Sequence, residues 1–234
     1  PAGTERTMNI KRSLATLLVA AAAGLGAGQS QAAFTFDSTG DSITTLYEYA
    51  YAPGTFLSAQ VTYTLQSLSG NNATFSVAIS NTTTAAQTGT NRLTSFGVGV
   101  ITPDLSCTQI DNSSIFNVQD GGNVPSGVGW VDFCATSGPN CSGGSSGGLG
   151  EAQSHAFNMT LSFVSSVSGG VTFDEPFYVR YQSVGSGDAG SIATEGCISG
   201  TPGCGGQIPE PGSLALASLA LLGLGVGTRR RRQS

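Results

Sequence analysis

The five cysteines are the residues whose type and spacing point most directly to chemistry. Cys134 and Cys141 enclose six residues that include Gly and Pro, and Cys197 and Cys204 enclose six residues of similar composition. A turn of this length can bring two Cα atoms within the roughly 5.5 Å that a disulfide needs. We therefore predict two local disulfides, which leaves Cys107 over. It is either free and buried, or paired between molecules, or the partner of Cys134 in place of Cys141.

Other side chains give little indication of catalysis. His155 is the only histidine; as a general base it would need a nucleophile and an orienting carboxylate, and a solvated residue at the start of a strand is the simpler interpretation. Asp174 and Glu175 would point to opposite faces of a strand, whereas glycosidase carboxylates face each other across a cleft. We expect these two to form a turn, and we predict no catalytic residues.

Ligand-binding residues are also few. Asp37 and Asp41 in DSTGD could hold calcium, but the loop lacks the dense acidic spacing of a strong site. Trp130, Tyr178 and Tyr181 could form a face that stacks on sugars, although single aromatic residues in strands are more often part of a core. A zinc site would need closely spaced cysteines or clustered histidines. We predict no metal and no cofactor.

Alternation of apolar and polar residues predicts that most of these side chains lie on or next to β-strands. Residues 60–68 alternate, with Val61, Tyr63 and Leu65 on one face and threonines on the other. The further candidate strands are 73–80, 93–101, 114–118, 129–135, 156–164 and 176–184. Their Thr, Val, Phe and Tyr content and their Gly, Asn and Ser breaks are typical of an all-β chain. We predict one antiparallel β-sandwich or jelly-roll-like ectodomain over residues 33–207.

The N-terminal region predicts export. Within residues 8–32, Lys11 and Arg12 precede a short apolar run, and small residues lead up to a cleavage position after Ala32. This order is that of a secretory signal peptide, and an exported chain matures where disulfides form. Residues 1–7 precede the first methionine, and we interpret them as a mis-called start.

The predicted ectodomain is strongly acidic. Between residues 33 and 207 only Arg92 and Arg180 are basic, against twelve carboxylates, which leaves a net charge of −10 compared with −5 for the whole chain. Such a surface argues against nucleic acid as a partner. It suits a protein that stays soluble in an extracellular matrix.

The C-terminal segment, residues 208–234, has three parts in order. Pro209, Glu210 and Pro211 form an extended motif, an apolar helix is predicted over 213–228, and four arginines follow. These arginines are Arg229, Arg230, Arg231 and Arg232. The apolar run would span about 21 Å as a helix, short of the roughly 30 Å of a bilayer core. The basic cluster favours the cytoplasmic side, so the preceding chain would lie outside the inner membrane.

This tail resembles a PEP-CTERM sorting signal. The resemblance covers about the last 27 residues. It implies recognition and cleavage by an exosortase, an integral-membrane cysteine transpeptidase of exopolysaccharide-producing Gram-negative bacteria. An ordinary single-pass tail anchor is the alternative. A Gly/Ser-rich ectodomain with cysteines also resembles the cistern family of PEP-CTERM proteins, which implies no particular activity.

We therefore expect a non-enzymatic protein of the cell surface or extracellular matrix, structural and linked to exopolysaccharide or biofilm. Its expected partners are the Sec export machinery, an exosortase and, transiently, the inner membrane, and exopolysaccharide is a further candidate partner. One alternative is a carbohydrate-binding module for the producer's own polysaccharide, and a secreted hydrolase is less favoured. A buried Trp130 and no acidic cleft would favour the structural reading over both.

Overall fold

The computed structural model describes residues 33–52, 55–83, 90–111, 113–144, 147–185, 190–202 and 204. In this part of the chain every regular element is a strand, and every strand pairing is antiparallel, which confirms the predicted all-β class. The strands are β1 (Phe34–Phe36), β2 (Ser42–Ala52), β3 (Thr55–Ser69), β4 (Asn72–Asn81), β5 (Arg92–Thr102), β6 (Leu105–Asp111), β7 (Asn117–Gln119), β8 (Gly122–Val124), β9 (Gly129–Val131), β10 (Phe133–Thr136), β11 (Ser154–Phe163), β12 (Val171–Val184) and β13 (Gly190–Ile198).

Alternating residues explain why these segments form strands. In β4 the buried positions alternate with half-buried or exposed ones, and Phe75, Val77 and Ile79 are fully buried. β11 repeats the pattern and pairs with β4 over nine residues, from Ser154↔Ser80 to Ser162↔Asn72. A period of two places every second side chain on the inner face of the sheet. The described strands therefore share one buried face.

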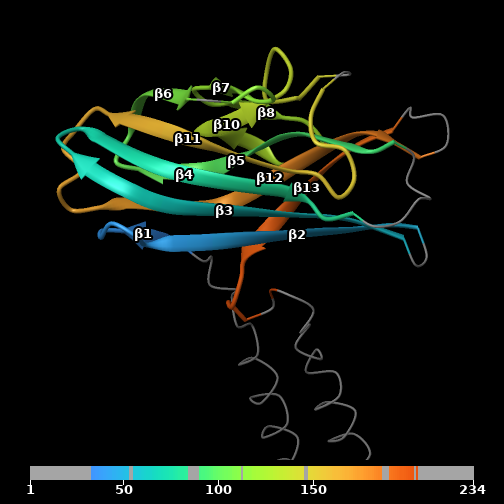
Figure 1. Ribbon diagram of the computed structural model, residues 1–234, viewed down its shortest axis with the longest axis horizontal. Coiled ribbons are helices and arrows are strands. Elements are labelled where there is room, and N and C mark those ends of the chain that lie inside the picture. The colour runs from blue at the N-terminus through green and yellow to red at the C-terminus, as the bar shows by residue number, and fades with distance from the viewer. Residues whose placement is uncertain are drawn as a thin grey trace, which may run out of the picture. The chain divides into compact units, whose positions relative to one another are not determined.

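One large sheet encloses the core. Its strand order is β6-β11-β4-β3-β2-β13-β12-β5-β10-β7, and β1 pairs with the first residues of β12, ahead of those that pair with β13 (Figure 1). The sheet curls until its two edge strands, β6 and β7, contact each other without forming a ladder. We call this unpaired junction the seam. The result is a nearly closed antiparallel barrel.

This arrangement differs from the predicted sandwich. A sandwich consists of two separate packed sheets, whereas here the long strands run through a single hydrogen-bonded path. β13 makes the decisive link, because its last residues pair with β2 while the rest of the strand pairs with β12. Single-strand periodicity does not reveal such a link, since both architectures bury one face of each strand.

Aromatic side chains fill the interior. The ring centroid of Phe173 lies 5.0 Å from that of Phe36, 5.2 Å from that of Phe75 and 5.3 Å from that of Tyr63. Edge-to-face and tilted contacts of this kind add to the free energy gained by burying the rings. The barrel interior is therefore a packed core.

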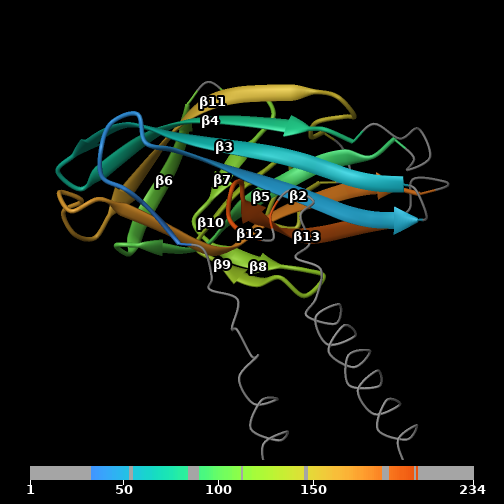
Figure 2. The ribbon, with the colours of Figure 1, turned by 90° about the horizontal axis from the view of Figure 1, so that it is seen from below.

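A second, smaller cluster lies outside the sheet. The β8–β9 hairpin packs against the outer side of the barrel near β10 and β12 (Figure 2). Val124 and Val131 from the hairpin meet Tyr178 of β12 and the two cysteines at positions 134 and 141. This outer cluster fixes the position of the hairpin, and with it the position of Trp130.

Several predictions fall on residues that the structure does not describe. These are the signal peptide 8–32 with its cleavage position Ala32, the motif Pro209 to Pro211, the helix 213–228 and the arginines 229–232. Within the described ranges, no helix has the length and apolar character needed to cross a membrane.

Candidate functional site

Both predicted disulfides are present. Cys134 and Cys141 are joined with Cα atoms 5.7 Å apart, and Cys197 and Cys204 with Cα atoms 5.6 Å apart. Cys107 is a free, half-buried thiol on β6. The sequence spacing therefore identified both pairs and the cysteine left over.

His155 has a structural environment. It lies near the start of β11, its Nε2 is 3.2 Å from the hydroxyl of Ser113, and its ring lies beside the rings of Phe116 and Phe157. The Ser113 hydroxyl also accepts hydrogen bonds from the backbone N–H groups of Ile115 and Phe116. Ser113 therefore closes a local turn, and His155 covers one end of the aromatic core.

The Gly/Ser-rich loop after Cys141 spells GxSxG between Gly143 and Gly147. That pattern marks a catalytic serine only at a sharp turn between a strand and a helix. Gly143 and Gly147 lie outside any regular element, and residues 145 and 146 are not among those described. The pattern reflects the loop's composition and supports no catalytic assignment.

In each of the two candidate acidic pairs, one carboxylate accepts hydrogen bonds from nearby backbone N–H groups. Asp174 and Glu175 lie within β12, at a register shift relative to β5, so the predicted turn at this point is wrong. The Asp174 carboxylate accepts a hydrogen bond from the backbone N–H of Glu175. In the DSTGD loop, the Asp41 carboxylate accepts hydrogen bonds from the backbone N–H groups of Asp37 and Ser38, which closes the turn.

The three candidate sugar-stacking residues do not form one face. Tyr178 and Tyr181 are fully buried, Tyr178 in the outer cluster and Tyr181 in the barrel core, and burial raises the pKa of both hydroxyls. Trp130, in contrast, is 69% exposed. The expectation of a core position is therefore right for the two tyrosines and wrong for Trp130.

Arg180 is an unusual buried charge. It is 8% exposed, and its Nη2 donates a hydrogen bond to the Ser191 hydroxyl at 3.1 Å. Its Nε and Nη1 have no hydrogen-bond partner in the described ranges. Burial lowers the pKa of its guanidinium. Among the residues that the structure describes, Arg180 has no ion-pair partner that would mark a recognition site.

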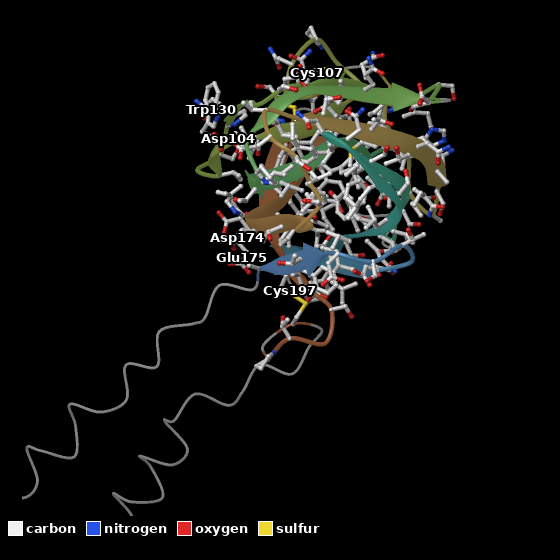
Figure 3. All side chains as sticks on the ribbon, turned by 90° about the vertical axis from the view of Figure 1, so that its left-hand side faces the viewer. Asp104, Cys107, Trp130, Asp174, Glu175 and Cys197 are labelled. Atoms are coloured by element: carbon white, nitrogen blue, oxygen red, sulfur yellow. A yellow bond between two sulfur atoms is a disulfide. The ribbon has the colours of Figure 1, made fainter. Side chains whose placement is uncertain are left out.

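The strongest candidate site in the described part of the chain is a pocket beside Trp130. A pocket of about 240 Å³ opens where the seam between β6 and β7 begins. Figure 3 shows Trp130 and Asp104 near each other, away from Asp174 and Glu175. The pocket is lined by Asp104, Leu105, Ser106, Asp120, Gly121, Trp130 and Asp132.

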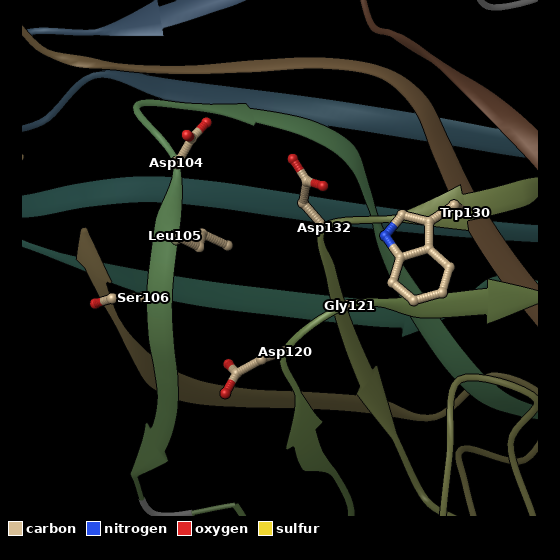
Figure 4. Close-up of a pocket in the computed structure, with 7 residues that line it drawn as sticks. All are labelled: Asp104, Leu105, Ser106, Asp120, Gly121, Trp130 and Asp132. Atoms are coloured by element: carbon tan, nitrogen blue, oxygen red, sulfur yellow. The ribbon is translucent and has the colours of Figure 1, made fainter. Parts of the chain in front are cut away.

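Three aspartates surround this pocket. In Figure 4 the carboxylates of Asp104 and Asp132 lie at the top of the pocket, Asp120 lies below and Trp130 to the right. One Asp132 carboxylate oxygen accepts a hydrogen bond from the backbone N–H of Ile101 at 2.9 Å. We call this set the seam pocket.

Sequence reasoning missed the three pocket aspartates. Asp104 follows a proline and Asp120 precedes two glycines, so each reads as an ordinary turn residue. The only local signal is the spacing of Trp130 and Asp132, which puts an aromatic ring and a carboxylate two residues apart. Their convergence depends on the seam, and the seam is a property of the whole barrel.

Comparison with known proteins finds a match in the C-terminal segment of the chain. Residues 207–232 match the family model described as the PEP-CTERM protein-sorting motif. The motif is the recognition signal for an exosortase, and it implies an exported protein that is processed at its C-terminus for a cell-surface or extracellular location. No curated protein and no solved structure matches the chain. The resemblance to the cistern family stays a prediction.

Proposed function

We propose that this protein is a non-enzymatic component of the bacterial cell surface or extracellular matrix, linked to exopolysaccharide or biofilm. The sorting motif at residues 207–232 is the observation that carries the proposal. In the proposed sequence of events, the Sec machinery of a Gram-negative cell exports the chain. The helix 213–228 then holds it briefly in the inner membrane, and an exosortase cleaves it near Pro209 to Pro211.

The architecture of the body supports this role. A packed barrel with two disulfides suits an oxidising environment outside the cytoplasm. The second disulfide ends at Cys204, only three residues before the matched motif begins. The folded body and the segment offered to the exosortase are thus separated by a short Gly-containing connection.

Intact mass of the protein from cells that carry an exosortase tests the proposal. We expect a species that starts at Ala33, ends between residues 209 and 211, and gains four hydrogens on reduction of its two disulfides. Additional mass in hexose steps would indicate a glycan. A stable membrane-bound form that retains Arg229 to Arg232 would contradict sorting and indicate a plain tail anchor.

One observation favours a second candidate, a carbohydrate-binding module. Trp130 is exposed at the rim of a pocket that carries three carboxylates. Indole rings stack on the C–H faces of sugar rings, and carboxylates accept hydrogen bonds from sugar hydroxyls. Binding of the full chain to a panel of oligosaccharides tests this candidate, and Trp130→Ala is expected to weaken that binding about tenfold or more. Release of new reducing ends during the assay would instead indicate hydrolysis.

A further inference from the structure

The seam gives the pocket its shape. Asp104 and the first two residues of β6, Leu105 and Ser106, line the pocket from one edge of the sheet. The chain after β7 contributes Asp120 and Gly121 from the other edge. Because β6 and β7 do not pair, backbone groups at this junction lack ladder partners. A volume of about 240 Å³ lies below the range of pockets for drug-sized ligands, which begins at about 300 Å³. The pocket is suited to a single ring.

Trp130 is held in its exposed position by its neighbours. In β9 the adjacent Val131 faces the outer cluster and is fully buried, so alternation turns Trp130 outward. Gly121 lies against the indole, because a Cβ at Gly121 would stand 3.6 Å from Cζ2 of Trp130. The ring is therefore positioned by a hairpin that packs against the outer cluster and by close contact with a glycine.

The carboxylates determine which ring would bind. Asp104 and Asp120 are exposed, and within the described part of the chain neither has an ion-pair partner or a side-chain hydrogen bond. Asp132 uses one carboxylate oxygen to accept a hydrogen bond from the Ile101 N–H. The three do not form a group that could hold a metal ion. Negative charges around one cavity attract a positively charged ligand and repel acidic sugars such as uronates.

We propose that the seam pocket binds an amino-sugar residue of a polysaccharide, one whose amine is free and protonated. The sugar ring stacks on Trp130, and the ammonium is held by Asp104 and Asp120. An ammonium near an indole also gains a cation–π attraction. This inference rests on the carbohydrate-binding candidate above, and adds the chemical class of the ligand.

The test compares three oligosaccharides that share one β-1,4-linked backbone. These are an oligomer of glucosamine, the same oligomer with acetylated amines, and an oligomer of glucose. Binding to the full chain is measured by calorimetry at two salt concentrations. We expect the glucosamine oligomer to bind about tenfold more tightly than the other two, which corresponds to about 1.4 kcal/mol.

Variants separate the contributions. Trp130→Ala is expected to weaken binding of all three oligomers about tenfold or more. Asp104→Asn and Asp120→Asn are expected to remove most of the preference for the amine while keeping the weaker binding of the neutral oligomer. Asp111→Asn, at the other end of β6, removes the same charge outside the pocket, and Phe56→Ala removes an exposed aromatic ring elsewhere. Neither control is expected to change binding.

Each other outcome has a defined meaning. Equal binding of the three oligomers would leave the carbohydrate-binding candidate intact and overturn the amino-sugar inference. No binding by any oligomer would overturn both. If Asp111→Asn weakens the glucosamine oligomer as much as Asp104→Asn does, the attraction is non-specific charge and the inference is wrong. Equal affinity for a lysine-rich peptide would overturn the sugar assignment in favour of a protein ligand.

Discussion

At the scale of single residues, Asp132 links the fold to the candidate site. It stands between β9 and β10, where its backbone N–H donates to the carbonyl oxygens of Val98 and Gly99 at 3.2 and 3.0 Å. Its carboxylate accepts a hydrogen bond from the backbone N–H of Ile101. The same residue therefore ends one strand, aligns the next against β5 and lines the seam pocket.

Replacing Asp132 tests this structural role. Asp132→Ala leaves the Ile101 N–H without its acceptor, and we expect it to lower the free energy of unfolding by about 1–3 kcal/mol. Asp132→Asn keeps an acceptor oxygen and is expected to cost less than half as much. Urea denaturation measures both, with Asp120→Ala as an exposed control expected within about 0.5 kcal/mol of the parent. Equal losses in the Ala and Asn variants would contradict the role of the hydrogen bond.

Four tyrosine hydroxyls are buried, and burial raises the pKa of each above its usual value of 10.0. They are Tyr47, Tyr63, Tyr178 and Tyr181. Below about pH 10 both the folded and the unfolded chain keep these groups protonated, so their contribution to stability is complete. Above that pH only the unfolded chain loses the protons, and stability falls by up to about 1.4 kcal/mol per pH unit for each tyrosine.

Tyr63→Phe checks this sign and size. The Tyr63 hydroxyl is buried and has no hydrogen-bond partner among the described residues, so we expect the variant to be at least as stable as the parent near neutral pH. Above about pH 10 the stability of the variant should fall less steeply with pH than that of the parent. The two slopes should differ by up to about 1.4 kcal/mol per pH unit, which is the contribution of one tyrosine. Urea midpoints measured from neutral to alkaline pH give both quantities. If the variant and the parent lose stability equally steeply above about pH 10, Tyr63 does not contribute to the alkaline loss of stability.

At the scale of elements, β5 depends on close approach by its neighbours. Gly97 pairs with Tyr178 of β12 and with Cys134 of β10. A Cβ at Gly97 would collide with the carbonyl oxygen of Phe133 and stand 2.6 Å from Cε1 of Tyr178. The Tyr178 ring therefore lies across the glycine, and this contact joins the outer cluster to the sheet.

Gly97→Ala is expected to destabilise the protein by about 2 kcal/mol or more, since the crowded atoms belong to backbone and a buried ring. Gly169→Ala is the matched control: a Cβ there has no atom within 4 Å. That change should leave stability the same or raise it by up to about 1 kcal/mol. Thermal unfolding of both variants is the measurement, and a neutral Gly97→Ala would show that the outer cluster packs loosely.

The two disulfides close loops of equal length, so they can be compared directly. Each should contribute about 2–3 kcal/mol through chain entropy. Cys134 and Cys141 are also buried in the outer cluster, whereas Cys197 is only half-buried. Replacing the first pair with alanines should therefore cost about 1–2 kcal/mol more than replacing the second pair. Denaturant unfolding measures both losses of stability. Equal losses for the two pairs would contradict an additional packing contribution from Cys134 and Cys141.

The elements also show where sequence patterns suffice. The long strands β3, β4, β5, β11 and β12 overlap predicted strands. β4 and β11 alternate between buried and more exposed positions, whereas β5 and β12 are buried over several consecutive residues and were predicted from their Val, Phe and Tyr content. β2 and β13 were not predicted, and the predicted strand 129–135 is divided at Asp132. β13 has few apolar side chains and is held mainly by its ladders with β12 and β2, which its own residues do not reveal.

At the scale of the whole molecule, charge is divided between the parts. Seven of the nine basic residues lie in residues 1–32 and 208–234, outside the acidic body. Removal of both ends changes the formal net charge from −5 to −10. The proposed processing therefore makes the protein more acidic, which favours solubility in a hydrated matrix.

Anion-exchange chromatography at pH 7 tests this consequence. The processed form should elute at higher salt than the full chain, and replacing Arg229 to Arg232 with glutamine should shift the full chain by four charges without moving the processed form. A variant with Pro209 and Pro211 replaced by alanine should accumulate only in the early-eluting, unprocessed position. If that variant is processed normally, the Pro-Glu-Pro motif is not the determinant.

Features that depend only on residues close together in the sequence could be predicted without the structure. Cysteine spacing is one, because a six-residue turn can close only a local disulfide. Strand periodicity is another. The order of motif, apolar run and arginines at the C-terminus is a third, and residues 207–232 match the model of the PEP-CTERM protein-sorting motif.

The tertiary structure alone decided how the strands join and what meets at the seam. A two-residue period specifies which face of a strand is buried, but it does not specify which strand lies beside it. The barrel path, the exposure of Trp130 and the gathering of Asp104, Asp120 and Asp132 all follow from that choice of neighbours. The candidate site is therefore a product of long-range pairing, because its residues acquire a common cavity only where the sheet fails to close.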